Sequence, residues 1–173
     1  MIPKVAIVGP ESTGKSSLAE ALSSHYRLPW VEEYSREYLE NLGRPYGQSD
    51  LIEIALGQLE LERRILEEKP SFLLCDTNLL VIKVWSEFKY GNADPALEKL
   101  YNLKDYCHYF LCDTDIPWSY DPLREHPEKR EELFEIYHHH LKQLGLSFSI
   151  IRGTKEERLQ QAVSEINQRI LAK

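Results

Sequence analysis

The sequence predicts an α/β fold in which a five-stranded parallel sheet carries helices on both faces. Strand-like and helix-like segments alternate along the chain, as they do where helices connect parallel strands. Several strand segments are continuous apolar runs, which is typical of strands buried on both sides. No repeat, low-complexity linker or break in composition divides the 173 residues, so we expect a single domain, residues 1–173.

The first two strands each lead into a helix. Val5–Val8 is a short apolar strand, and the helical segment Ser17–Leu22 follows it after a glycine-rich turn. Leu28–Glu32 has the pattern of the second strand, with Pro29 at its start or at a sheet edge. The next helix is indicated by side chains at helical spacing, and Gly43 ends it: Tyr34, Tyr38, Leu39 and Leu42.

The middle of the chain supplies the third strand. Asp50, with Glu53 three residues later, is expected to cap a long helix that ends near Glu68. Phe72–Cys75 is a continuous apolar run ended by Asp76, as expected of a central parallel strand.

The remaining segments complete the alternation of strands and helices. In order, they are a helix over Leu79–Phe88, a short helix from Asp94-Pro95, a strand over Tyr109–Cys112, a polar loop, a helix from near Pro127 to just before Gly145, a strand over Ser147–Ile151 and a final amphipathic helix.

Charge and hydropathy narrow the choice of partners and compartment. The 28 acidic and 21 basic side chains give a net charge of −7, which argues against a nucleic-acid or anionic-membrane surface. No apolar run is long enough for a membrane span or a signal peptide, so we expect a cytoplasmic protein. Cys75, Cys107 and Cys112 lack metal or redox spacing and are expected to be buried thiols. The oligomeric state is left open.

The turn after the first strand fits the pattern G-x-x-x-x-G-K-[ST] at Gly9–Ser16. A strand that turns through glycines into a helix N-terminus aims backbone N–H groups at one point, where they bind phosphate. Lys15 is expected to reach the β- and γ-phosphates, and the Ser16 hydroxyl to ligate Mg²⁺. The expected contacts to ATP are Gly9, Glu11, Ser12, Thr13, Gly14, Lys15, Ser16 and Ser17. The alternative is a strand-to-helix turn without a ligand. With this loop, the fold class becomes a P-loop NTPase.

Acidic residues follow the second and third strands, at the sheet edge where ligands bind. Asp76 has the Walker-B position and is expected to hold Mg²⁺, unless it only caps the next helix. Glu33 is a candidate general base for a substrate hydroxyl; Glu32 is the alternative, and strand register decides between them. Arg36 is a candidate for binding the substrate or its phosphate, or else forms a surface salt bridge.

The polar segment of residues 113–130 has the character of a lid. Arg124 and Arg130 are placed to fold over the phosphates, although a charged helix start would show the same residues. At the last strand-to-helix turn, Gly153 is a candidate adenine contact. Aromatic residues near the expected rim could stack on a flat ring: Trp85, Tyr90 and Trp118. We discount His138–His140 as a metal site, because consecutive helical side chains diverge.

These motifs together resemble the ribosylnicotinamide kinase domain of the bacterial trifunctional NAD-biosynthesis regulator and its stand-alone relatives. The resemblance rests on the phosphate loop and on four further segments: Glu33–Glu37, Cys75–Thr77, Asp115–Trp118 and Asp121–Arg124. It implies ATP and Mg²⁺ as cofactors, nicotinamide riboside as the small-molecule acceptor of the γ-phosphate at its 5′-hydroxyl, and Glu33 as the base. Because the chain begins at its first strand, we expect neither the DNA-binding module nor the adenylyltransferase of the multi-activity members.

Two residues depart from the pattern of that family. Asn78 stands where a second acid is expected after Asp76-Thr77, and Pro122 stands where glycine is usual before the lid arginine. The alternatives are a kinase of another nucleoside or vitamin precursor, a regulatory NTP-hydrolysing switch, and an AAA-type mechanical ATPase. The chain lacks the N-K-x-D and D-x-x-G signatures of a guanine-nucleotide switch, and its length leaves little room for the helical domain of a mechanical ATPase.

Overall fold

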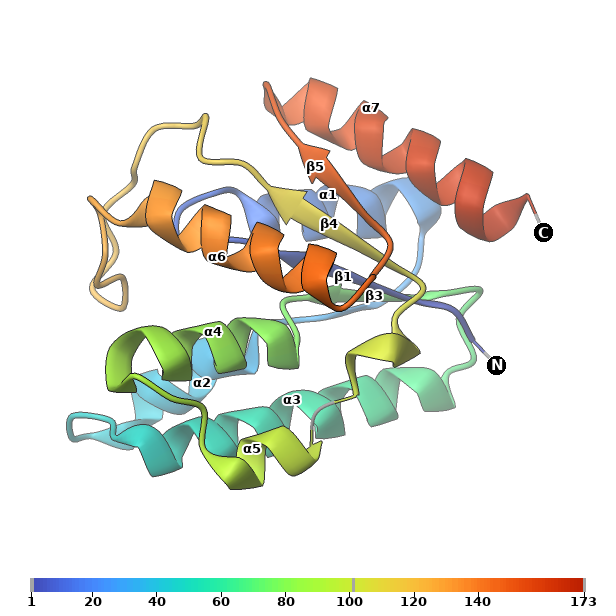
Figure 1. The fold of residues 1–173 in the computed structure, drawn as a ribbon. Helices are drawn as coiled ribbons and strands as arrows, with labels where there is room; N and C mark the ends of the chain where they lie inside the picture. Colours follow the sequence, from blue (N-terminus) through green and yellow to red (C-terminus); the bar gives the residue numbers. More distant parts are fainter. Residues whose placement is uncertain (1, 101, 173) are drawn as a thin grey trace.

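The computed structural model describes residues 2–100 and 102–172, which form a parallel sheet between layers of helices (Figure 1). The sheet has the order β2-β3-β1-β4-β5, and every neighbouring pair is parallel. Its strands are β1 Lys4–Val8, β2 Trp30–Val31, β3 Leu73–Asp76, β4 His108–Cys112 and β5 Phe148–Ile151. The predicted fold class is therefore confirmed.

Helices cover both faces of this sheet (Figure 1). They are α1 Lys15–Tyr26, α2 Tyr34–Leu42, α3 Gln48–Glu67, α4 Leu79–Tyr90, α5 Pro95–Leu100, α6 Arg130–Gln143 and α7 Lys155–Ile166, with a 3-10 turn at Leu103–Asp105 and a π-helical end at Asn167–Leu171. One face packs against α1 and α7, and the other against α4 and α6.

Alternation along β1 divides the core between these two faces. Val5 and Ile7 pack in the cluster under α1 and α7, whereas Ala6 and Val8 pack in the cluster under α4 and α6. All four side chains are fully buried, so β1 has no solvent face and reads as a continuous apolar run. A third cluster joins α3, α4 and α5.

The start of α3 differs from the sequence prediction. Asp50 does not cap this helix; Gly47 holds the cap position, and Asp50 Oδ2 accepts a hydrogen bond from the Gly47 amide at 2.7 Å. Asp50 also binds the Tyr38 hydroxyl and the Arg44 guanidinium. These donors explain why a buried carboxylate is favourable three residues inside the helix, and Arg44 together with the other two lowers the pKa of Asp50.

Three smaller predictions also require correction. The second strand spans only Trp30–Val31, because it is an edge strand paired with β3 alone. The helix expected from Pro127 begins at Arg130, after a turn in which the Lys129 amide bonds to the His126 carbonyl. Cys107, expected to be buried, is exposed just before β4, while Cys75 and Cys112 are buried.

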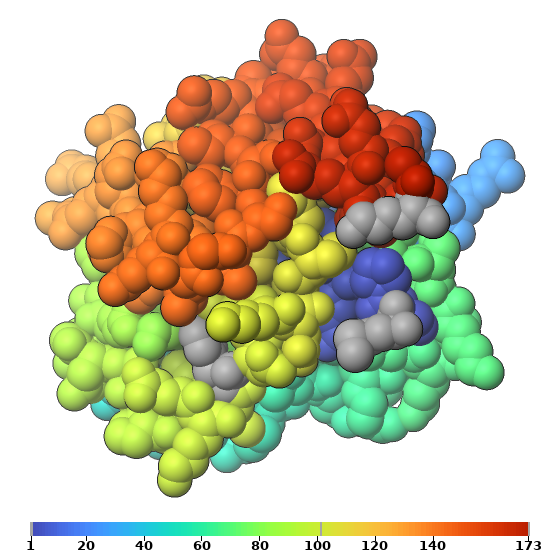
Figure 2. Space-filling model, turned by 45° about the vertical axis from the view of Figure 1, so that its right-hand side comes forward, coloured from blue at the N-terminus to red at the C-terminus, as the bar shows by residue number. Residues whose placement is uncertain are grey.

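The strands begin at the end of the sheet away from the phosphate loop. Ordinary side-chain packing fills this end. Figure 2 shows the blue start of the chain at the surface between the red C-terminal helix and green residues at the end of α3. Here the buried Glu62 pairs with Lys4 at 3.1 Å and accepts a hydrogen bond from Tyr106.

Along the described parts of the chain, no helix is both long and apolar enough to cross a membrane.

Candidate active site

The loop between β1 and α1 has the curled backbone that a phosphate site requires. Gly9, Ser12 and Gly14 have positive φ angles of 139°, 55° and 77°. A Cβ atom at Gly9 would lie 2.8 Å from a carbonyl oxygen of β4, so this close approach requires glycine. Thr13 Oγ1 donates to the Pro10 carbonyl at 2.7 Å and closes the loop on itself. Because Gly14 is the cap residue of α1, the helix N-terminus is available to stabilise an anion here.

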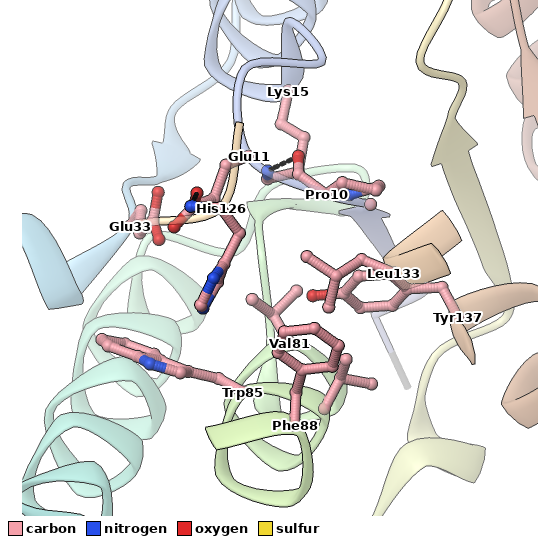
Figure 3. A pocket seen from close by; sticks show the side chains of 12 residues that line it. Pro10, Glu11, Lys15, Glu33, Val81, Trp85, Phe88, His126, Leu133 and Tyr137 are labelled. Atoms are coloured by element: carbon pink, nitrogen blue, oxygen red, sulfur yellow. Dashed lines mark hydrogen bonds between the residues drawn. The ribbon is translucent and has the colours of Figure 1, made fainter. Parts of the chain in front are cut away.

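Lys15, Ser16 and Asp76 lie together beside this loop. Lys15 Nζ donates to the Pro10 carbonyl at 2.7 Å, so the ammonium group folds back over the loop (Figure 3). Ser16 Oγ donates to Asp76 Oδ2 at 2.5 Å, whereas the buried Asp76 Oδ1 has no hydrogen-bond partner among the described residues. Burial, together with the charge of Glu33, raises the pKa of Asp76 to about 7.

This pair of side chains fits a magnesium ion. Mg²⁺ is a hard cation that binds through oxygen ligands, and a serine hydroxyl beside a carboxylate supplies two. A cation would also satisfy the unpaired Asp76 Oδ1 and favour the ionised carboxylate. Within residues 2–100 and 102–172, no group of three His, Cys, Asp or Glu side chains forms a separate metal site. In the histidine run, His140 instead lies 2.9 Å from Glu87.

The two acidic residues after β2 occupy different places. Glu33 lines both the pocket at the phosphate loop and the apolar pocket described below. Glu32 lines neither of them and borders a groove between β2, α2 and α3. Ser35 Oγ donates to Glu33 Oε1 at 2.8 Å, which orients the carboxylate. Of the two candidates for the base, Glu33 is therefore the one that the fold brings to Lys15.

The lid segment, residues 113–129, joins β4 to α6 and reaches back to the phosphate loop. Arg130 Nη1 donates to the Ser12 carbonyl at 3.1 Å, and Arg124 Nη1 lies 3.5 Å from Ser12 Oγ. The Ser119 amide also donates to Ser12 Oγ, at 2.8 Å. Both guanidinium groups lie 5.9 Å from the centre of the Trp118 ring. The two predicted lid arginines thus converge on the phosphate loop.

Further contacts tie the lid segment to both sides of the site. The Glu11 carboxylate accepts hydrogen bonds from the Glu125 and His126 amides, each at 3.1 Å. The Glu125 side chain accepts from Tyr46 Oη at 2.6 Å and from Lys89 Nζ at 2.9 Å. Lid residues 125–126 therefore contact the phosphate loop through their backbone, and the α2–α3 loop and α4 through the Glu125 side chain.

Arg36 extends this closure from the other side of the loop. It lines the pocket at the phosphate loop, and its Nη2 atom donates to Asp121 Oδ2 of the lid segment at 2.9 Å. Arg36, which was predicted to bind the substrate, therefore links α2 to the lid segment through an ion pair.

An apolar pocket opens onto the phosphate loop (Figure 3). It has a volume of about 550 Å³, its open mouth included. Its apolar walls come from α4 and α6, and its polar groups from the loop, the lid segment and the β2–α2 turn. The side chains that line it include Glu11, Lys15, Glu33, Val81, Trp85, Phe88, His126, Leu133 and Tyr137. The pocket has the mixture of flat apolar walls and few polar groups typical of a small-molecule site.

A second cleft lies on the far side of the loop, at α1 and the start of α7. It is lined in part by Gly14, Ser17, Ile116, Pro117, Lys155 and Arg158. Next to it, the Gly153 amide donates to Asp115 Oδ2 at 2.6 Å. Gly153 has a φ angle of 92° and lies at the expected turn after β5.

Arg158 holds that side of the site together and was missed in the sequence. Its side chain is only 4% exposed. Its guanidinium donates to the Thr13 carbonyl at 2.8 Å and the Gly153 carbonyl at 2.9 Å, and pairs with Asp115. A signal was present, because Arg158 lies four residues before Ala162 on the buried stripe of α7.

Other sequence candidates lie in different surroundings. Trp85 lines the apolar pocket, but Tyr90 packs in the cluster of α3, α4 and α5. Trp118 lies under the lid arginines, and Asp113 pairs with Arg152 at 2.5 Å. His126 and Tyr137 were not anticipated as pocket residues. Tyr137 lies four residues after Leu133 on the buried face of α6, which is the one sign of its position.

Known proteins resemble this chain over most of its length. Residues 4–158 match the protein family described as AAA domain. The trifunctional NAD biosynthesis/regulator protein NadR of Salmonella typhimurium (strain LT2) is 27% identical over 124 residues, 69% of this chain and 30% of that protein. Its counterpart in Escherichia coli (strain K12) is 26% identical over 126 residues, with the same coverage. The chain thus spans less than a third of these curated relatives.

Solved structures share the fold. NadR in complex with NAD and AMP-PNP has a TM-score of 0.77 at 21% identity and covers 98% of this chain and 50% of that one. NadR in complex with NR has a TM-score of 0.75 at 22% identity, covering 98% and 51%. Deoxyadenosine kinase from M. mycoides with bound dCTP has a TM-score of 0.58 at 14% identity, covering 95% and 99%. With the phosphate loop, the Ser16–Asp76 pair and the parallel sheet in place, the chain belongs to the AAA domain family of P-loop proteins.

Proposed function

We propose that this chain is a small-molecule kinase that transfers the γ-phosphoryl group of ATP to the 5′-hydroxyl of nicotinamide riboside. The observation that carries the proposal is that two pockets meet at shared side chains. The pocket at the phosphate loop and the apolar pocket are both lined by Glu11, Lys15 and Glu33. Phosphoryl transfer needs this arrangement, because the attacking hydroxyl and the terminal phosphate must approach each other.

The chain's own residues divide the work of the reaction. The loop amides and Lys15 bind the triphosphate and offset its negative charge as it shifts during transfer. Glu33 accepts the proton of the acceptor hydroxyl, since it lies at the junction of the two pockets. Ser16 and Asp76 would hold Mg²⁺, which when bound would neutralise negative charge on the phosphates. The cleft at Ser17, Ile116 and Lys155, with the turn at Gly153, would take the base of ATP.

The lid segment and the start of α6 supply cations, and the lid segment excludes water. Arg124 and Arg130 already contact Ser12 of the phosphate loop, so small movements of their side chains would bring them to the transferring group. Glu11 and Arg36 fix the lid segment at two further points. A closed lid favours transfer to the acceptor over hydrolysis, because bulk water is kept from the γ-phosphate.

Nicotinamide riboside is the proposed acceptor because of the pocket walls and the relatives. Trp85, Phe88 and Tyr137 give aromatic surface for a flat, positively charged ring, which such faces attract. Among the relatives, NadR has been solved in complex with NR. A kinase acting on another nucleoside or vitamin precursor would use the same residues, and a deoxyadenosine kinase shares the fold.

The two other classes of function make different demands. A mechanical ATPase needs a helical domain over the nucleotide, whereas the described residues between β4 and α6 form an irregular lid segment. A regulatory switch hydrolyses its nucleotide without an acceptor and has no use for an apolar pocket beside the phosphate loop.

A panel of acceptors tests the proposal. Purified protein would be given ATP, Mg²⁺ and, in turn, nicotinamide riboside, deoxyadenosine, other nucleosides and vitamin alcohols, with ADP release measured against an acceptor-free control. We expect ADP release to rise many-fold with nicotinamide riboside. A larger rise with another acceptor would reassign the substrate, and equal rates with and without every acceptor would favour the switch.

A further inference from the structure

Glu33 sits in a stretch of chain that the sheet barely supports. β2 contains only Trp30 and Val31, which pair with β3 at Leu74 and Cys75. The ladder ends there, so residues 32 and 33 leave the edge of the sheet before α2 begins at Tyr34. A general base must be held accurately, because small displacements from the reacting atoms cost large factors in rate.

One side chain from α3 replaces the missing sheet contacts. Gln58 Oε1 accepts a hydrogen bond from the Tyr34 amide at 2.9 Å. Gln58 Nε2 donates to the Glu32 carbonyl at 3.2 Å. The carboxamide therefore binds the backbone on both sides of Glu33.

The burial of Gln58 makes this contact notable. Gln58 is only 1% exposed, in the middle of a helix whose other buried residues are mostly apolar. A buried amide is costly unless its donor and acceptor are both paired, and leucine would satisfy the packing of a helix interior without that requirement. The glutamine is therefore explained by the turn that it binds.

The neighbouring residue fits the same purpose. A Cβ atom at Gly57 would lie 2.0 Å from the Tyr34 ring, so that ring packs directly on the backbone of α3. Gly57 therefore contacts the ring of Tyr34 and Gln58 binds its backbone amide, and Tyr34 is the residue next to Glu33. Ser35 then orients the Glu33 carboxylate itself, through the hydrogen bond at 2.8 Å.

We infer that Gln58 is a positioning residue, which holds the Glu32–Tyr34 backbone so that Glu33 faces the junction of the two pockets. This inference rests on the proposed function, in which Glu33 is the base. Gln58 itself touches no substrate: it is absent from the lining of both pockets. Its effect on the reaction therefore passes through the backbone that it binds, on which Glu33 lies.

A double-mutant cycle with Glu33 tests this coupling. Gln58→Met removes both hydrogen bonds while keeping an unbranched side chain of similar length. We expect it to lower kcat by about 10-fold or more in the wild-type background, with the KM for ATP nearly unchanged. In a Glu33→Gln background, where the base is already absent, we expect the same change to lower kcat less than about two-fold.

A purely structural role gives a different pattern. If Gln58 only stabilised the fold, Gln58→Met would reduce kcat by the same factor in both backgrounds, and that result would overturn the inference while leaving the proposed function intact. If Glu33→Gln alone kept full turnover, Glu33 would not be the base. The proposed function and the inference about Gln58 both depend on that role. Gln48→Met is the matched control, because Gln48 lies on the same helix but bonds to Ser86 and Asn92; its kcat should be unchanged.

A milder variant guards against loss of folding. Gln58→Asn keeps a buried amide, but it is one methylene too short to reach both Tyr34 and Glu32. The same cycle applies to it, with melting temperatures recorded for every protein. We expect its loss of kcat also to shrink in the Glu33→Gln background, and undiminished loss there would contradict the coupling.

Discussion

Ser16 Oγ donates a hydrogen bond of 2.5 Å to Asp76 Oδ2, which joins the phosphate loop to the end of the neighbouring strand β3. The contact links residues 60 positions apart, and β1 and β3 are adjacent in the sheet. It leaves Asp76 Oδ1 buried and unpaired among the described residues, with the pKa of this carboxyl raised to about 7 by burial and by Glu33. The ionised Asp76 carboxylate is therefore destabilised by burial and by repulsion from Glu33. We call this electrostatic strain, and a bound cation would relieve it.

This strain predicts opposite effects of Asp76→Asn on stability and activity. Because the pKa of Asp76 is higher in the folded protein than its ordinary value of 3.8, its stabilising contribution is full below about pH 4 and is lost as pH rises through about 7. At pH 8 without metal, we expect Asp76→Asn to raise the melting temperature, by roughly 2–4 °C for each kcal/mol relieved. At pH 4 the two proteins should differ less.

Turnover should respond in the other direction. With Mg²⁺ and ATP present, Asp76→Asn should lower kcat because the cation loses a charged ligand. Melting curves at both pH values and steady-state rates check the two parts. An Asp76→Asn protein that is less stable than wild type at pH 8 without metal would contradict the strain.

Lys15→Ala should abolish most turnover while the fold is kept. Lys15 Nζ contacts only the Pro10 carbonyl among the described hydrogen bonds, so little packing depends on it. Loss of a cation that stabilises the transition state typically costs about 10²–10³-fold in kcat. Lys99 is exposed on α5, so Lys99→Ala is the control that removes the same charge. Turnover by Lys15→Ala within a few-fold of that control would rule out the role.

Glu33→Gln and Glu32→Gln form a matched pair. Of these two acids, Glu33 alone lines both pockets, so we expect Glu33→Gln to lower kcat by about 10²–10⁴-fold, the usual contribution of a general base. Binding of ATP, measured by calorimetry, should change little in either variant. Glu32→Gln should be near wild type, and the reverse ranking would transfer the role to Glu32.

The two lid arginines should be separable by stability. Arg130 joins the start of α6 to the carbonyls of Ser12 and Ile116, whereas Arg124 donates to the Ser119 carbonyl within the lid segment and lies 3.5 Å from Ser12 Oγ. We expect Arg124→Ala to lower kcat with little change in melting temperature, and Arg130→Ala to lower both. Acceptor-free ATP hydrolysis and melting curves would be compared with Arg63→Ala, an exposed change on α3. Equal losses of stability for Arg124→Ala and Arg130→Ala would contradict the distinction.

Arg158→Leu should destabilise the protein strongly. The guanidinium is 4% exposed and pairs with Asp115, so its removal takes the Arg158 donors from the Thr13, Gly153 and Asp113 carbonyls and one donor from the Asp115 carboxylate. Leaving a buried acceptor without its donor costs about 1–3 kcal/mol, measurable by urea unfolding. Arg169→Ala, which removes an exposed pair with Glu165, should cost less than about 1 kcal/mol. Similar costs for the two variants would show that the Arg158 network contributes little.

Much of the fold was predictable because its signals are local. The apolar run Val5–Val8 and the pattern at Gly9–Ser16 each lie within a few residues, and together they specify a strand, a loop and a helix start. Helix starts were harder. Asp50 looks like a cap from its neighbours in sequence, yet the structure gives the cap position to Gly47 and turns Asp50 toward Tyr38 and Arg44.

The candidate site was predictable where residues follow strands or, like Arg36, Arg124 and Arg130, lie in the connections that come after them. Glu33 and Asp76 follow β2 or end β3, so the parallel order of the sheet brings them to the phosphate loop. Gln58, His126 and Arg158 come from helices or the lid segment, and each has a partner far away in the sequence: Tyr34 at 24 residues, Glu11 at 115 and Thr13 at 145. Contacts over such distances depend on how α3 and α7 pack, which periodicity alone does not give.

The most direct measurement follows the phosphoryl group itself. Wild-type protein would be incubated with γ-labelled ATP, Mg²⁺ and nicotinamide riboside, and the label would be traced among ATP, free phosphate and nicotinamide mononucleotide. The account predicts that label enters the 5′-phosphate of nicotinamide mononucleotide much faster than it enters free phosphate. Label that passes to free phosphate at the same rate with and without the riboside would contradict it.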